Sequence, residues 1–145
     1  MARDRLRSVR TIRDRTVDGL RRDLAACVAA ETAVEARIAN LEDAVRRDRA
    51  AHGMLEDAHR FQDMFAKRRA AGETERAAAV RDLAEARARS AEVRADLVAA
   101  RVAAEAVGAV IAERAGAVAI TRVRREQTDL EEAARSGNRP MGGEG

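Results

Sequence analysis

The amino-acid sequence predicts an all-α protein, a long two-helix antiparallel coiled-coil hairpin with a disordered C-terminal tail. Its 145 residues include 35 Ala and 27 Arg, both strong helix formers, but only two Phe and neither Trp nor Tyr. A chain so poor in aromatic residues, with 37% of its residues charged, lacks the side chains that fill a globular core. The one proline is Pro140, so no residue before it has to break a helix.

The periodicity of the first half predicts one helix from residue 4 to about residue 67. Its seam residues follow one another in alternating steps of three and four, which is the heptad spacing of a coiled coil. Upstream, Leu6, Val9 and Ile12 continue the apolar stripe after a five-residue step, as at a stutter. This first seam consists of Val17, Leu20, Leu24, Cys27, Glu31, Val34, Ile38, Leu41, Val45, Asp48, His52, Leu55, His59 and Gln62.

A second seam predicts a second helix over about residues 73–135, and the two helices together form one domain, residues 1–135. Between the seams, Gly72 can take the left-handed conformation that ends helices, and Glu73 and Glu75 suit the start of the next helix. We therefore predict the turn at about residues 69–74, with arms of nearly equal length. The second seam consists of Leu83, Ala86, Ser90, Val93, Leu97, Ala100, Ala104, Val107 and Ile111, and continues less regularly through Val118, Val123 and Leu130.

The two ends of the chain carry further expectations. Residues 136–145, SGNRPMGGEG, have linker composition and are expected to form the disordered tail. Met1 is followed by charged residues rather than by the apolar stretch of a signal peptide, and no apolar stretch approaches the roughly 18 residues of a membrane span. We expect a cytoplasmic protein with no membrane insertion.

No group of residues in the sequence predicts catalysis or cofactor binding. Glu56 and His59 match the Glu-x-x-His unit of di-iron bundles, and His52 and Asp63 share their helix face, but such a site needs a second unit. The single cysteine, Cys27, cannot form an internal disulfide. The sequence has neither a Gly-rich phosphate loop nor a nucleophile paired with a base. We expect no enzymatic activity, no catalytic residue, no metal, no cofactor and no small-molecule substrate.

Positive charge is concentrated at the N-terminus, although the chain as a whole carries a net charge of only +3. Residues 1–25 hold eight Arg and four Asp. The aspartates are interleaved with the arginines and no aromatic residue accompanies them for base stacking, so nucleic acid is not the expected partner. The arginines fit a solvated coiled-coil end, and an acidic partner, if the protein has one, would dock here.

Both phenylalanines lie close to the predicted turn. Phe61 and Phe65 are four residues apart and so share one face of a helix, beside the seam rather than in it. They either close the hairpin tip or form an apolar patch for a partner, since Phe is enriched in interface cores. We take both as candidate partner-binding residues.

Two stretches of the sequence carry a family resemblance. Residues 6–17 form an apolar stripe that precedes a charged, Ala-rich helix. Residues 113–135 place basic residues before Glu126 and Gln127 and then acidic residues, with Leu130 separating Asp129 from Glu131. In these stretches, in length and in two-arm design, the chain resembles the FliJ/YscO family, the small stalk proteins of flagellar and virulence type III protein export.

The resemblance implies a monomeric antiparallel coiled coil similar to the central stalk subunit of rotary ATP synthases. Its paired helix ends would enter the ring of the export ATPase hexamer, and its middle would contact the export gate protein. Export chaperones are further expected partners, and the protein would be peripheral at the inner-membrane export machinery. We expect Arg122, Arg124 and Arg125 to contact the ATPase, because the hairpin sets this mixed-charge run beside the basic N-terminal residues.

Two other functions are compatible with the sequence. One is a generic cytoplasmic coiled-coil scaffold that dimerises, whereas the stalk would sediment as an elongated monomer. The other is a basic nucleic-acid-associated protein, for which salt-dependent DNA binding would be lost on deletion of residues 2–15.

Overall fold

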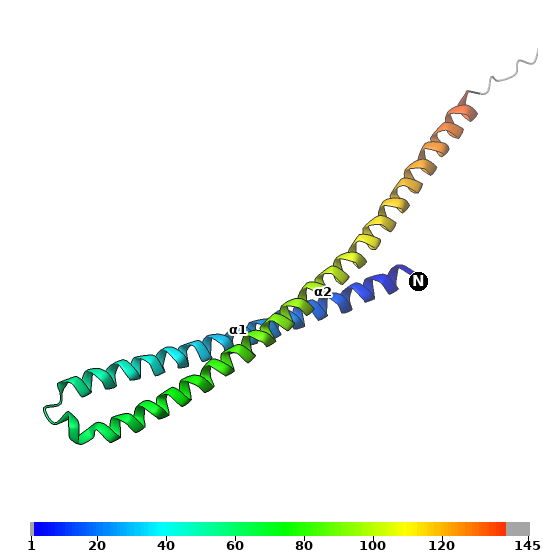
Figure 1. Ribbon diagram of the computed structural model, residues 1–145. Helices are drawn as coiled ribbons and strands as arrows, with labels where there is room; N and C mark the ends of the chain where they lie inside the picture. Colours follow the sequence, from blue (N-terminus) through cyan, green and yellow to red (C-terminus); the bar gives the residue numbers. More distant parts are fainter. Residues whose placement is uncertain (1, 139–145) are drawn as a thin grey trace, which may run out of the picture. The chain divides into compact units, whose positions relative to one another are not determined.

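A computed structural model describes residues 2–138, and this part of the chain is almost entirely helical (Figure 1). It contains two long helices, α1 (Ala2–Met54) and α2 (Gln62–Gly137), joined through a short 3-10 helix, η1 (Ala58–Phe61). No strand occurs among residues 2–138. The predicted all-α class with two helices is confirmed.

The chain divides into two compact units. Among the described residues, one unit comprises residues 15–100, and the other comprises residues 2–14 together with 101–138. Within residues 15–100, α1 and α2 lie side by side (Figure 1) and run in opposite directions, because the residue numbers of α2 fall as those of α1 rise along the contact. Four ion pairs join the two helices there: Glu35 with Arg87 at 3.0 Å, Arg37 with Asp82 at 3.2 Å, Glu42 with Arg76 at 3.0 Å and Asp48 with Arg68 at 3.0 Å.

The contact between the helices in this unit follows the predicted seams. Every first-seam residue from 17 to 52, and every second-seam residue from 83 to 100, is buried or half-buried. The seam is thin, however: apart from Phe65, the buried apolar residues of this unit are Val17, Ala79 and Leu97. Since an alanine buries little more than one methyl group, each layer of the contact contributes modestly to stability.

The predicted turn at residues 69–74 is wrong. The chain reverses direction over residues 55–61, and residues 69–74 lie inside α2. The arms are therefore unequal, with 53 residues in α1 and 76 in α2. The reason is packing: the second seam continues backwards at intervals of seven residues through Ala79, Gly72 and Phe65, all buried or half-buried. The Phe65 ring packs edge-on against His52, with the ring centroids 4.7 Å apart, and this contact ends the first seam.

Replacing Gly72 by alanine should raise the free energy of unfolding by about 0.5 to 1 kcal/mol, since alanine is the better helix former. Gly72 lies within α2 without a positive φ, and a Cβ at this position would meet nothing within 4 Å. Urea denaturation of Gly72→Ala measures the change. A destabilised variant would instead favour a turn at this glycine.

In the second unit, Arg10 of α1 lies against Gly108 of α2. A Cβ on Gly108 would lie 2.6 Å from Nη1 of Arg10, so the missing side chain leaves room for this guanidinium group. Beyond this contact, every residue from 112 to 138 is exposed, including Val118, Ile120, Val123 and Leu130. We call residues 112–137 the free end of α2, because no described segment of the chain covers it.

The helix end differs slightly from the prediction. α2 ends at Gly137 rather than at residue 135, so the first residues of the predicted disordered tail are helical. Residues 139–145 of that predicted tail lie outside the described residues.

Candidate partner-binding surfaces

The predicted partner-binding residues belong to different units. Phe61 and Phe65 lie in the unit of residues 15–100, whereas Arg122, Arg124 and Arg125 lie on the free end of α2. These two groups are therefore described separately.

The two phenylalanines differ in exposure. Phe61 ends η1 and is 41% exposed, whereas Phe65 lies in α2 and is only 8% exposed. The prediction that both rings are available to a partner is wrong for Phe65, because its ring is buried and packs against His52. Phe65 closes the hairpin against His52.

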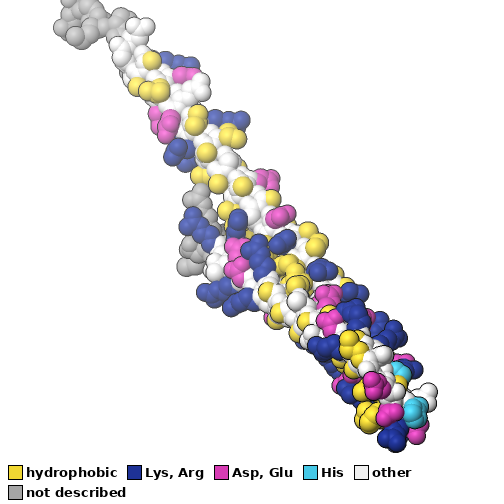
Figure 2. Space-filling model, turned by 90° about the vertical axis from the view of Figure 1, so that its left-hand side faces the viewer, with side chains coloured by type: hydrophobic (Ala, Val, Ile, Leu, Met, Phe, Trp, Pro, Cys, Tyr) yellow, Lys and Arg dark blue, Asp and Glu magenta, His cyan; other side chains and the backbone are white. Residues whose placement is uncertain are grey.

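Exposed apolar side chains gather at the turn. We define the hairpin tip patch as Met54, Leu55, Phe61 and Met64, which are 86%, 41%, 41% and 47% exposed. Charged residues interrupt the patch, among them Arg60 with its ion pair to Asp57 at 3.9 Å. Figure 2 shows this mixture of apolar and charged side chains at the end that carries the histidines. Flexible methionine side chains of this kind adapt to a partner's surface.

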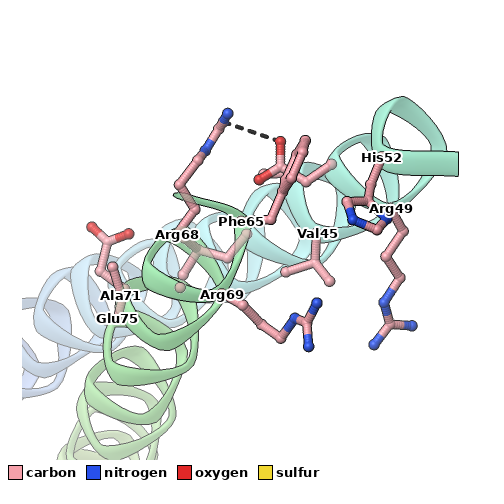
Figure 3. Close-up of a pocket in the computed structure, with 12 residues that line it drawn as sticks. Val45, Arg49, His52, Phe65, Arg68, Arg69, Ala71 and Glu75 are labelled. Atoms are coloured by element: carbon pink, nitrogen blue, oxygen red, sulfur yellow. Dashed lines mark ion pairs between the residues drawn. The ribbon is translucent and has the colours of Figure 1, made fainter. Parts of the chain in front are cut away.

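A groove lies between α1 and α2 next to the turn, with a volume of about 360 Å³ (Figure 3). Its lining includes the apolar side chains of Leu41, Val45 and Phe65. Sequence reasoning missed this groove, and the interval of seven residues between Phe65 and Gly72 could have shown only that both lie on one face of α2. The full lining consists of Leu41, Ala44, Val45, Asp48, Arg49, His52, Phe65, Arg68, Arg69, Ala71, Gly72 and Glu75.

The arginines of the groove differ in their pairing. Arg68 pairs with Asp48 at 3.0 Å on one side of the groove. Arg49 and Arg69 extend from α1 and α2 on the other side (Figure 3), and neither has an ion pair within residues 2–138. The groove thus combines apolar lining residues with two arginines that have no ion pair in the described chain, which suits an acidic, partly apolar ligand.

The free end of α2 presents a different surface. Arg122 pairs with Glu126 at 3.6 Å, whereas Arg124 and Arg125 have no ion pair among the described residues. Arginines that have no ion pair of their own can form bidentate contacts with the carboxylates of a partner.

The described residues contain no arrangement for metal chemistry. Within residues 2–138 no group of three or more His, Cys, Asp and Glu side chains could hold a metal ion. Glu56 lies ahead of η1 and His59 within it, so this pair does not share a regular α-helix. None of the helices in the described part of the chain is long and apolar enough to cross a membrane.

Comparisons with known proteins add no relative. No protein-family model, no curated protein and no solved structure matches this chain.

Proposed function

We propose that this chain is a non-enzymatic stalk component of a type III protein export apparatus, flagellar or injectisome. In this proposal the end of α2 enters the ring of the export ATPase hexamer, and the hairpin tip patch contacts the export gate protein. The protein works in the cytoplasm, peripherally at the inner-membrane machinery, with export chaperones as further partners. The resemblance of residues 6–17 and 113–135 to the FliJ/YscO family supports the proposal.

As part of the same proposal, α1 and α2 pack as an antiparallel coiled coil. The steps of three and four residues between covered positions support this packing. The four ion pairs that join the helices also support it, because charged residues beside a coiled-coil seam commonly bridge the two strands.

The observation that carries the proposal is the exposure of the free end of α2. Residues 112–137 would extend about 39 Å as a helix, at 1.5 Å per residue. Helices in proteins take most of their stability from tertiary packing, and here Val118, Ile120, Val123 and Leu130 are all more than half exposed. A ring that surrounds the helix would cover these side chains and bring acidic groups to Arg124 and Arg125.

The test is a triple charge reversal, Arg122→Glu, Arg124→Glu and Arg125→Glu. We expect association with the export ATPase to weaken at least about tenfold, since each reversal replaces an attraction by a repulsion. Helical content should stay the same, because all three side chains are exposed. Binding is measured by surface plasmon resonance, and stimulation of ATP hydrolysis by a coupled assay.

A matched control reverses three exposed arginines on the hairpin, Arg81, Arg89 and Arg94, which also have no ion pair within residues 2–138. The control changes the net charge by the same amount, but its three sites lie outside the proposed contact. It should therefore retain ATPase binding. Unchanged binding and stimulation in the first variant, or equal losses in both, would contradict the proposed contact.

A further inference from the structure

The groove beside the turn is lined by two arginines without an ion pair among the described residues, whereas other arginines of the hairpin pair with a carboxylate on the opposite helix. Four arginines reach across between α1 and α2, and each meets a carboxylate on the opposite helix. Arg49 and Arg69 also come from opposite helices and extend on the same side of the groove (Figure 3), but no carboxylate of the described chain pairs with either. The unpaired carboxylate of the lining, Glu75, lies apart from them in Figure 3. This side of the groove is open to an acidic ligand.

The groove also has room for an apolar side chain. Its volume is about 360 Å³, its lining includes Leu41, Val45 and Phe65, and a Cβ at Gly72 would meet nothing within 4 Å. The Phe65 ring, which lines the groove, packs edge-on against His52. A ligand that pairs one large apolar group with nearby carboxylates would therefore match both features.

The free end of α2 carries that combination. Residues 126–132, which we call the acidic segment, contain four carboxylates and no basic residue. Leu130 in this segment is 71% exposed. Glu126 lies one helical turn before Leu130, and Asp129 follows Glu126 by three residues, so both carboxylates flank one side of the leucine. No described residue of the same chain packs against the segment.

We propose that the groove binds the acidic segment of a second copy of this chain. Leu130 of the second copy enters the groove above Phe65, while Glu126 and Asp129 accept hydrogen bonds from Arg49 and Arg69. The binding mode is that of an amphipathic helix in an apolar groove, and the charge-assisted hydrogen bonds fix its direction. Glu126 leaves its exposed ion pair with Arg122, which costs little because such surface pairs contribute little. This self-association is independent of the proposed stalk function and competes with it, because both use the free end of α2. Association of the wild-type protein would therefore count against a stalk that acts only as a monomer.

The test uses the full-length chain in sedimentation velocity over a concentration series. The wild-type protein should associate as its concentration rises, into a closed pair if the exchange is reciprocal and into open chains if it is not. The groove variant, Arg49→Glu with Arg69→Glu, and the segment variant, Glu126→Arg with Asp129→Arg, should each associate at least about tenfold more weakly. Leu130→Ala should also weaken association, without any change of charge.

The decisive step is to mix the two charge variants. Each alone brings like charges together, but the mixture sets the arginines of one variant against the glutamates of the other, so association should return. The control variant Arg81→Glu with Arg89→Glu changes the charge as the groove variant does, and it should associate like the wild type. Circular dichroism checks that every variant is helical.

Three results would overturn the proposal. They are a wild-type protein that stays monomeric throughout the series, a groove variant that associates as strongly as the wild type, and a mixture of the charge variants that does not associate.

Discussion

Truncation of Phe65 to alanine is expected to lower the free energy of unfolding by about 3 kcal/mol. This is the usual cost of removing a buried phenylalanine ring. Phe65 is 8% exposed and is the largest of the buried apolar side chains in the described part of the chain. The edge-on contact with His52 adds to the loss, since paired rings contribute about 0.5 to 1.5 kcal/mol beyond the area they bury. In a seam built largely from small side chains, few neighbours can move in to refill the space.

Phe61→Ala is the matched control, because it removes the same ring from the same turn. Phe61 is 41% exposed, so its truncation should cost less than about 1 kcal/mol. Urea denaturation followed by circular dichroism compares the two variants. Equal losses would mean that both rings close the hairpin and that Phe61 is not free for a partner.

The double substitution Glu31→Leu with Ser90→Ala is expected to raise the free energy of unfolding by about 2 kcal/mol. Both residues lie in the seam, and Oε1 of Glu31 and Oγ of Ser90 are buried without a hydrogen-bond partner. They face the same stretch of the contact, because the nearby Glu35 and Arg87 pair across it. A buried polar group without a partner costs about 1 to 3 kcal/mol, and apolar replacements remove that cost.

The higher free energy of unfolding of the double variant should appear as a higher midpoint of urea denaturation, with an unchanged slope of the free energy against urea concentration. Glu92→Leu serves as the control, because Glu92 is exposed on α2 and its replacement adds an apolar side chain without relieving a buried group. A double variant no more stable than the wild type would indicate that water or a rearranged side chain satisfies both atoms.

The sequence predicted two helices and, within residues 17–52 and 83–111, the positions that are buried or half-buried, whereas Leu55, His59, Gln62, Val118, Val123 and Leu130 are exposed. The agreement has a physical reason. Large apolar residues such as Leu24, Ile38 and Leu97 recur at heptad intervals, and burying them is the main gain available to this chain. The turn was misplaced because Gly72 and Ala79 occupy seam positions with almost no side chain, which hides the periodicity. The packing of Phe65 on His52 outweighs the local preference of Gly72 to end a helix, so α2 continues through this glycine.

The candidate surfaces were harder to predict than the helices. The groove depends on which residues of α1 face which residues of α2, and the misplaced turn shifts that register. Arg49 and Arg69 look like ordinary surface arginines in the sequence, and only the structure brings them to one side of a groove. In contrast, Arg122, Arg124 and Arg125 are all exposed on the free end of α2, and their function as an ATPase contact stays a prediction.

The two helices differ in length, and this difference affects how the protein can evolve. Residues 112–137 pack against no described part of their own chain, so substitutions there open no cavity and strain no neighbour. Selection on stability therefore acts mainly on the residues that α1 and α2 bury together. The free end of α2 needs only to keep its helical propensity, and its side chains can diverge quickly to follow a changing partner. Sequence drift in this stretch would alter recognition while leaving the folding of the hairpin untouched.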